Sequence, residues 1–341
     1  MKEVMYKVRN SLRSGITFTG SMKQLLDILN CSGKVFIQMH NSPDPDSIAS
    51  AFGLQYLLAE AGIEAEICYR GEIDKYSTQR MMELLDIRLR NIRDIKDMME
   101  EDYIILIDSQ KGNSNVTDFI GNEIASIDHH PVFHKYDYLF SDIRPQVGAC
   151  SSIIAHYFLD SKITIPSNIA TALIYGIKTD TLDLSRGVSE LDLDMFYTLY
   201  KAADIDLLNN IQLNQLQFCE LTAYSNAINN IRIFENIGIS NLGTDCPDSL
   251  LGTISDFLMS LKEVEFSIVY SRRNSGVKFS LRNETDYYDA GKIIEKALQG
   301  LGSGGGHKTM AGGFIPDTAL KNLDSSFDSF IENWILEILK E

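Results

Sequence analysis

Acidic and histidine side chains directly follow several apolar segments in the first half of this chain. Segment 34–39 is followed by His40, Asp44 and Asp46, and segment 103–107 is followed by Asp108. Segment 123–127 is followed by Asp128, His129 and His130, and segment 173–179 is followed by Asp180. Carboxylate oxygens mixed with imidazole nitrogens suit Mn²⁺ better than a metal that prefers thiolates. If these residues gather in one place, they form a site for metal ions.

A parallel α/β sheet would bring these residues together. Short β-rich runs at 34–39, 65–69, 103–107 and 123–127 alternate with helical patterns such as 47–61. That alternation predicts parallel strands with helices between them, and ligands bind beyond the carboxyl ends of such strands. We expect the four polar groups to lie at four strand ends along one edge of the sheet.

The number of acidic groups points to more than one metal ion. Five carboxylates this close together could not all stay ionised without a compensating positive charge. The ligands exceed what one ion needs, so the pattern favours two ions. Two metals about 3.5–4 Å apart clamp the attacking and leaving oxygens in phosphoryl displacement.

Each group taken alone also has an ordinary structural explanation. Residues 43–46 could form a turn that caps the helix starting near Ser47, and Asp108 could be a loop residue. Residues 128–130 could cap a loop. Four segment ends would then need four unrelated explanations, so we prefer a shared metal site.

A glycine-rich segment at 302–313 is the second candidate site. Gly304, Gly305 and Gly306 would expose backbone N–H groups to a phosphate, and His307 and Lys308 would add charged donors. Arg272, Arg273 and Arg282, on a predicted hairpin before it, would reach the same phosphate. The alternative is a flexible surface turn. The segment is neither a dinucleotide-binding motif nor a P-loop, because no strand precedes it.

The second half of the chain has a different pattern of predicted helices and strands. Residues 209–231 form a helical, Asn- and Gln-rich connector. Beyond it we expect strands at 237–242, 264–270 and 276–281 and helices at 288–298 and 325–339.

The composition describes a folded, acidic protein. Among 341 residues, 44% are hydrophobic, and 31 basic against 47 acidic residues give a net charge of −16. This length predicts about two domains. An acidic surface repels polyphosphate backbones, so we expect no long nucleic acid as a partner.

Targeting and redox signals favour a cytoplasmic protein. The cysteines are scattered without C-x-x-C, which predicts reduced thiols; they are Cys31, Cys68, Cys150, Cys219 and Cys246. No apolar stretch approaches the ~18 residues of a membrane span. Residues 1–20 contain no apolar signal core, so we expect no membrane association.

Four motifs, in this order, resemble the DHH phosphoesterase family. They are H-x-x-P-D-x-D-S at 40–47, the aspartate at position 108, D-H-H-P at 128–131 and G-I-x-T-D-T at 176–181. Two later elements, S-x-R at 271–273 and G-G-G-H at 304–307, resemble the DHH-associated C-terminal domain. The resemblance is strongest to the nano-RNase, phosphoadenosine-phosphate phosphatase and linear-dinucleotide phosphodiesterase type.

The resemblance implies an α/β fold in two parts. An N-terminal domain with a doubly wound, mainly parallel sheet would precede a smaller C-terminal α/β domain, with the active-site cleft between them. The expected bounds are 1–215 for the DHH metal-binding catalytic domain, 216–235 for a helical connector and 236–341 for the DHH-associated substrate-binding domain.

The resemblance also implies a ligand set for two Mn²⁺ ions, with Mg²⁺ or Co²⁺ as substitutes. The first ion would be held by His40, Asp44 and Asp108. The second would be held by Asp46, Asp108, His129 and Asp180, so that Asp108 bridges the two.

The remaining implied roles concern catalysis and substrate. Water activated between the ions would attack phosphorus, His130 would sit by the scissile phosphate, and Asp128 would orient a histidine. The substrate would be gripped by Gly304, Gly305, Gly306, His307, Lys308 and Arg273.

The expected function is Mn²⁺-dependent hydrolysis of very short oligonucleotides, such as nano-RNA and the linear dinucleotide pApA, to mononucleotides. One alternative is a phosphatase for nucleoside 3′,5′-bisphosphates such as pAp, and another is an exopolyphosphatase-like enzyme. The non-enzyme alternative is a nucleotide-binding regulator. We expect a monomer or a homodimer whose partner is the short oligonucleotide or nucleotide substrate.

Overall fold

The computed structural model describes residues 18–29, 33–213 and 216–320. The chain divides into two compact units, Met1–Gln215 and Leu216–Glu341, and each is described by itself. The first 17 residues, Cys31 and the helix expected at 325–339 lie outside the described residues. Among the described residues, no helix combines the length and apolar character needed to cross a membrane.

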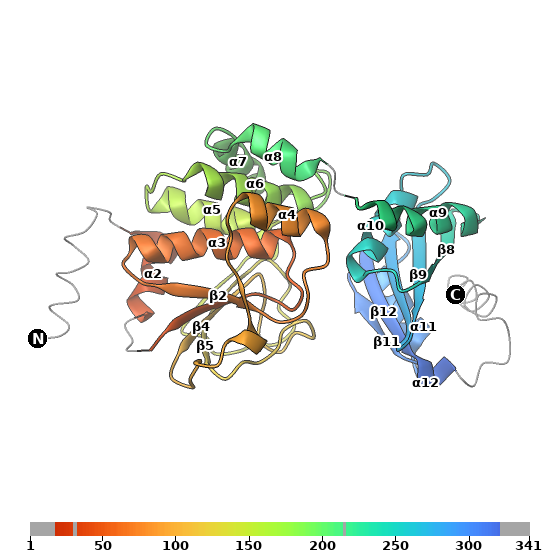
Figure 1. The fold of residues 1–341 in the computed structure, drawn as a ribbon, viewed down its shortest axis with the longest axis horizontal. Helices are drawn as coiled ribbons and strands as arrows, with labels where there is room; N and C mark the ends of the chain where they lie inside the picture. Colours follow the sequence, from red (N-terminus) through yellow and green to blue (C-terminus); the bar gives the residue numbers. More distant parts are fainter. Residues whose placement is uncertain (1–17, 30–32, 214–215, 321–341) are drawn as a thin grey trace, which may run out of the picture. The chain divides into compact units, whose positions relative to one another are not determined.

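The first unit is built on a six-stranded parallel sheet (Figure 1). Its strands are β1 Val35–Gln38, β2 Ala65–Tyr69, β3 Arg90–Asn91, β4 Tyr103–Ile107, β5 Asn122–Asp128 and β6 Phe140–Ile143. Their spatial order is β3-β2-β1-β4-β5-β6, and every neighbouring pair is parallel. The order reverses between β1 and β4, which is where open parallel sheets bind ligands.

Helices of the first unit gather over one face of the sheet (Figure 1). They are α2 Gly20–Ile28, α3 Pro45–Glu60, α4 Tyr76–Leu84, α5 Cys150–Asp160, α6 Ser167–Asp180, α7 Glu190–Tyr200 and α8 Ile205–Gln212. The opposite face buries Phe36, Ile104 and Leu106 beneath the short 3₁₀ helix η1, Ile92–Asp94, and neighbouring loops.

Local sequence explains the central elements. All four residues of β1 are buried, as expected for an apolar strand in the middle of a parallel sheet. Helix α3 begins with Pro45 in its first turn, and the Asp44 carboxylate accepts a hydrogen bond from Ser47 N at 3.0 Å. Asp44 is therefore both a helix cap and a candidate ligand.

One predicted strand is wrong. Residues 173–179 belong to helix α6, and Asp180 is its last residue. A continuous apolar run does not distinguish a buried strand from a buried helix by periodicity. Here Ala170 and residues 172–174 are all buried because α6 packs between other helices. The short strands β3 and β6 were not predicted.

The second unit contains a mixed six-stranded sheet (Figure 1). Its strands are β7 Arg232–Phe234, β8 Ile237–Thr244, β9 Phe266–Arg273, β10 Gly276–Asn283, β11 Ser303–Gly306 and β12 Met310–Pro316. The order is β11-β12-β10-β9-β8-β7, and among the described strands of this second sheet only β8 and β9 pair in parallel.

Helices cover both faces of this second sheet. They are η2 Phe218–Glu220, α9 Leu221–Asn230, α10 Asp248–Leu258, α11 Ala290–Leu298 and α12 Asp317–Leu320. Helices α9 and α10 pack on one apolar face and α11 on the other.

The glycine-rich segment is not the loop that we expected. Residues 303–306 form strand β11, which pairs antiparallel with β12, so only 307–309 remain as a turn. Glycine disfavours strands in isolation. The β11 strand forms because β12 offers a partner and because its glycines permit close packing against α11.

Candidate metal centre

The fold brings the predicted acidic and histidine residues of the first unit to one place. His40 follows β1, Asp44 and Asp46 begin α3, and Asp108 follows β4. Asp128 ends β5 and is followed by His129 and His130, whereas Asp180 is the last residue of α6. Three strand ends and two helix ends therefore converge on the edge of the sheet where the strand order reverses.

One group of ligand atoms surrounds His40. Its Nε2 lies 3.8 Å from Asp44 Oδ2 and 3.7 Å from Asp108 Oδ2. The ligand atoms of these three residues all lie within 4.8 Å of one another. That spacing is compatible with a single cation among them.

A second group surrounds His129. Its Nε2 lies 3.3 Å from Asp108 Oδ1, 3.3 Å from Asp180 Oδ2 and 4.0 Å from Asp46 Oδ2. Asp46, His129 and Asp180 again keep their ligand atoms within 4.8 Å. Asp108 presents Oδ2 to the first group and Oδ1 to the second, which is the orientation of a bridging carboxylate.

Backbone carbonyls orient two of the imidazole rings. His40 Nδ1 donates to Asn41 O at 3.0 Å, and His129 Nδ1 donates to Val147 O at 3.2 Å. Because a carbonyl oxygen can only accept, each ring carries its proton on Nδ1 and turns Nε2 toward the carboxylates. Metal-binding histidines are held in this way by their surroundings.

Asp46 is held by the start of another helix. Its Oδ2 accepts from Cys150 N at 2.7 Å, and its Oδ1 accepts from Ser151 N at 2.9 Å. Both N–H groups belong to the first turn of α5, which has no side-chain cap of its own. The positive end of the α5 dipole thus supports a fully buried carboxylate.

Asp128 orients His130 and is itself oriented by Gln110. Asp128 Oδ1 accepts from His130 Nδ1 at 2.9 Å and from His129 N at 2.8 Å. The buried Gln110 Nε2 donates to Asp128 Oδ2 at 2.7 Å and to His130 O at 3.1 Å. Gln110 was not among the predicted site residues, and its place two residues after Asp108 was the available signal.

The chemistry of the ligand atoms fits divalent cations. Asp108 is 1% exposed, and its Oδ1 together with His129 Nε2 has no hydrogen-bond partner in the described structure. Asp108 also has φ 53°, a left-handed conformation that costs energy for a residue other than glycine. A buried imidazole nitrogen and a buried carboxylate oxygen that face each other need a proton or a cation between them.

The pKa values of these groups show how strongly they interact without metal. Burial lowers the pKa of His40, but hydrogen bonding to Asp44 and the charges of Asp44 and Asp108 outweigh it and raise that pKa to about 10. Burial and the charge of Asp44 raise the pKa of Asp180 to about 6. Burial, Asp180 and Asp108 raise the pKa of Asp46 well above its usual range. Crowded carboxylates thus retain protons that a cation would displace.

The glycines of the second unit have packing roles. A Cβ at Gly304 would lie 2.9 Å from Ile294 O of α11, and Gly306 has φ 150° and would clash with Ala311. Only Gly305 of the three faces open space. His307 and Lys308 are exposed at the turn, and their carbonyls accept hydrogen bonds from Gly291 N and Ala290 N.

Of the three candidate arginines, Arg273 and Arg282 lie toward opposite ends of the second sheet. Arg273 pairs with Gly276 and Arg282 pairs with Met310, so Arg282 is at the end that leads to His307. Strand spacings put Arg273 roughly 20 Å from Gly306. Arg273 instead donates to Cys246 O and pairs with Asp248. This separation does not favour one phosphate shared by Arg273 and the glycine segment, and a role of Arg273 in gripping the substrate stays a prediction.

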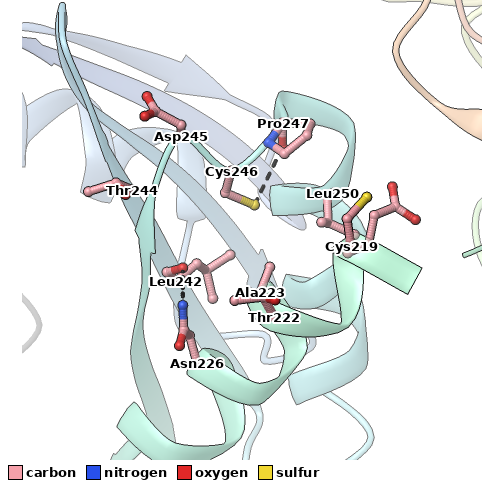
Figure 2. A pocket seen from close by; sticks show the side chains of 11 residues that line it. Cys219, Thr222, Ala223, Asn226, Leu242, Thr244, Asp245, Cys246, Pro247 and Leu250 are labelled. Carbon is pink, nitrogen blue, oxygen red and sulfur yellow. Dashed lines mark hydrogen bonds between the residues drawn. The ribbon is translucent and has the colours of Figure 1, made fainter. Parts of the chain in front are cut away.

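Cys246 lines a separate pocket in the second unit (Figure 2). The pocket has a volume of about 300 Å³ and lies between α9, the end of β8 and the start of α10. Burial raises the pKa of the Cys246 thiol to about 11, and its Sγ donates to Pro247 O at 3.7 Å. None of the predicted site residues lines this pocket. Cys68, Cys150, Cys219 and Cys246 are all unpaired.

Comparison with known proteins identifies both halves of the chain. Residues 34–177 match the model of the DHH family, N-terminal domain, and residues 235–333 match the DHHA1 domain. The chain belongs to the DHH family. The matched ranges contain every predicted metal ligand except Asp180 and all the predicted substrate-binding residues.

Relatives by sequence include two kinds of protein. An uncharacterized protein of Methanocaldococcus jannaschii is 32% identical over 83% of this chain and 58% of its own length. A probable manganese-dependent inorganic pyrophosphatase of Streptococcus thermophilus is 28% identical over 44% of this chain and 48% of its own length. The chain thus spans about half to three-fifths of the curated relatives it matches.

A solved structure shares the fold. The crystal structure of an exopolyphosphatase-related protein from Bacteroides fragilis matches 97% of this chain and 100% of its own, with 19% identity and a TM-score of 0.72. At this identity the likeness concerns the fold. The active-site cleft expected between the two domains stays a prediction.

Proposed function

We propose that this protein is a divalent-metal-dependent phosphoesterase that hydrolyses very short oligonucleotides, including linear dinucleotides, to mononucleotides. The observation that carries the proposal is the buried Asp108 carboxylate, whose two oxygens face two separate ligand groups. A carboxylate shared in this way is what a two-metal phosphoryl site needs.

The residues divide into two ligand sets. His40, Asp44 and Asp108 would hold one cation, and Asp46, Asp108, His129 and Asp180 would hold the other. Two Mn²⁺ ions bound there would act as Lewis acids on phosphoryl oxygens and lower the pKa of water. Manganese is favoured by the mixed carboxylate and imidazole ligands and by the relatives named as manganese-dependent pyrophosphatases.

We expect His130 to contact the substrate phosphate. It is the more exposed of the two adjacent histidines, with 37% of its side chain accessible against 11% for His129. Burial lowers the pKa of His130, but the hydrogen bond to Asp128 and the charge of Asp108 raise it overall. With Nδ1 engaged by Asp128, Nε2 is the atom that would donate to a phosphate oxygen.

The second domain would select substrate. The DHHA1 match covers the turn with His307 and Lys308, which supplies cations that could grip a nucleotide phosphate. In the register of the sheet Arg282 lies nearer that turn than Arg273, and its guanidinium pairs with Asp256 of α10. Inorganic pyrophosphate is the second candidate substrate, because the pyrophosphatases resemble 44% of this chain.

The test is a side-by-side assay of the full chain with Mn²⁺. The substrates are pApA, a five-nucleotide RNA, adenosine 3′,5′-bisphosphate and pyrophosphate, with AMP and phosphate release followed by chromatography. Release of AMP from pApA or RNA, abolished by EDTA, is expected. Release of phosphate from the bisphosphate alone would make the protein a phosphatase. Nucleotide binding with no turnover of any substrate would contradict the proposal and favour a regulator.

A further inference from the structure

The segment after His130 carries a concentration of exposed apolar side chains. Residues 131–137, here called the aromatic loop, are all exposed. Phe133 is 65% exposed, Val132 46% and Tyr136 41%. Single exposed apolar residues are ordinary, but a group of them beside a candidate site marks a binding surface.

The aromatic loop starts at the metal centre. It follows directly after His130, whose Nδ1 lies 3.7 Å from Asp108 Oδ1. The Cα of Phe133 is three residues on and therefore at most about 11 Å from that of His130. Gln110 Nε2 donates to His130 O at 3.1 Å and to Pro131 O at 3.5 Å, which fixes the start of the loop.

The end of the aromatic loop is tied to the same edge of the sheet. The Tyr138 hydroxyl accepts from Lys111 N at 2.8 Å. The Tyr136 hydroxyl lies against Gly112, where any Cβ would clash with it, and the Tyr136 and Tyr138 rings are 6.3 Å apart. Lys111 and Gly112 belong to the segment that follows Asp108. Both ends of the loop are therefore anchored next to the bridging carboxylate.

Phe133 is the part of the loop that these anchors leave free. In the described structure its ring contacts no other aromatic ring, unlike those of Tyr136 and Tyr138. An exposed aromatic ring on a short loop that starts at a candidate phosphate site suits a flat, partly apolar group attached to that phosphate. Stacking of a nucleobase on an aromatic side chain is worth about 1–3 kcal/mol.

We propose that Phe133 is a stacking platform for the nucleobase of a nucleotide whose phosphate lies at the metal centre. This inference rests on the proposed function and narrows its substrate class to phosphate esters that carry a base. Base-free phosphates would reach the metal centre without any contribution from Phe133. The residue would thus decide specificity and would leave the chemistry of phosphate hydrolysis unchanged.

The experiment measures binding and turnover in Mn²⁺-loaded full-length protein. Calorimetry gives the Kd of AMP and of ribose 5-phosphate for wild type, Phe133→Ala and Phe133→Trp. Phe133→Ala should weaken AMP binding between about 5-fold and 150-fold and leave ribose 5-phosphate unchanged. Phe133→Trp should restore AMP binding. The matched control is Tyr197→Ala, because Tyr197 on α7 is also 65% exposed.

Distinct outcomes separate the failure of this inference from that of the proposed function. Equal effects of Phe133→Ala on AMP and ribose 5-phosphate would overturn the platform even if pApA is hydrolysed. A change in oligomeric state with unchanged AMP affinity would also overturn it, because a protein surface would then cover the loop. Selective loss of AMP binding in a protein that hydrolyses no substrate would support the platform and reject the enzyme.

Discussion

The two units present their candidate functional groups in opposite ways. In the first, Asp46, Asp108 and Asp128 are at most 1% exposed and each is held by hydrogen bonds or packing from several elements. In the second, His307 and Lys308 stand exposed on a turn at the edge of a sheet. Buried charges that repel one another require a partner of opposite charge, whereas exposed cations are already solvated.

On the proposed function, the first unit would control the chemistry. Removing a buried ligand changes the electrostatics of a whole cluster, since each pKa there depends on its neighbours. Removing an exposed cation such as Lys308 removes a single contact, which solvent and salt already weaken. We therefore expect large effects on kcat from the first unit and moderate effects on KM from the second. Four predictions test this contrast, ordered from the largest expected effect to the smallest.

Asp108→Asn should reduce kcat by about 1,000-fold or more at saturating Mn²⁺, because both ligand groups lose their shared charge. Asparagine tolerates the left-handed backbone of position 108, so folding should survive. Turnover of pApA and bound manganese measured by elemental analysis check this result. The control is Asp194→Asn, an exposed change on α7. Near-normal kcat in Asp108→Asn would reject the shared-carboxylate site.

Manganese affinity should rise about tenfold per pH unit for each proton displaced, or about 100-fold from pH 6.5 to 8.5. The pKa of His40 is raised to about 10 without metal, so His40 is protonated below that pH and the cation must displace the proton. Calorimetry in buffers of different ionisation enthalpy counts the protons released. His40→Gln should lower this count by about one.

The histidine control for that measurement is His156→Gln, because His156 lies 3.4 Å from Asp160 on α5 and outside the ligand groups. It should leave proton release unchanged. Manganese binding without any pH dependence would contradict the protonated state inferred for His40.

Arg282→Lys should raise KM for pApA by about tenfold with little change in kcat, since a charged hydrogen bond is worth about 1.5–3 kcal/mol. Arg282 lies near the end of β10 opposite Met310, which leads back to His307, and its guanidinium would have to bind the phosphate while paired with Asp256. Arg273→Lys, at the far end of the same sheet, should change KM less than about twofold. The reverse ranking would show that Arg273 contacts substrate.

Gly176→Val should destabilise the first unit by about 1–3 kcal/mol, because overpacking forces neighbours to move. A Cβ at Gly176 would lie 2.9 Å from Asp46 Oδ1 and would clash with the Ser151 hydroxyl. Gly305→Val in the second unit meets open space and should change stability by less than about 0.5 kcal/mol. Thermal unfolding measures the midpoint of each variant. Equal midpoints for Gly176→Val and Gly305→Val would contradict the predicted difference in packing at the two glycines.

Much of the first unit could be predicted from the residues alone. The strands at 65–69 and 103–107 have the predicted bounds, and β1 and β5 differ from them by one residue at each end. Continuous apolar, β-branched runs that end at polar residues predict where such strands begin and end without knowledge of the fold. The types of the acidic and histidine residues and their places after those runs predicted that they would gather at one edge of the sheet, whereas their division into two ligand sets came from the family resemblance.

Three features depended on tertiary structure. Residues 173–179 became helical because α6 is buried among α3, α5 and α7, which no local pattern records. The glycine segment became a strand because β12 and α11 supply its partners. Arg273 and Arg282 were separated by the register of β9, β10 and β12.

Residue type alone indicates which side chains could bind metal and phosphate, because that chemistry belongs to their functional groups. Only the fold decided which oxygen of Asp108 faces which histidine, and that the α5 N-terminus holds Asp46. Those arrangements join residues more than 60 positions apart, such as His40 and Asp108. Their spacing is set by sheet register and helix packing, which arise only when the whole unit is assembled.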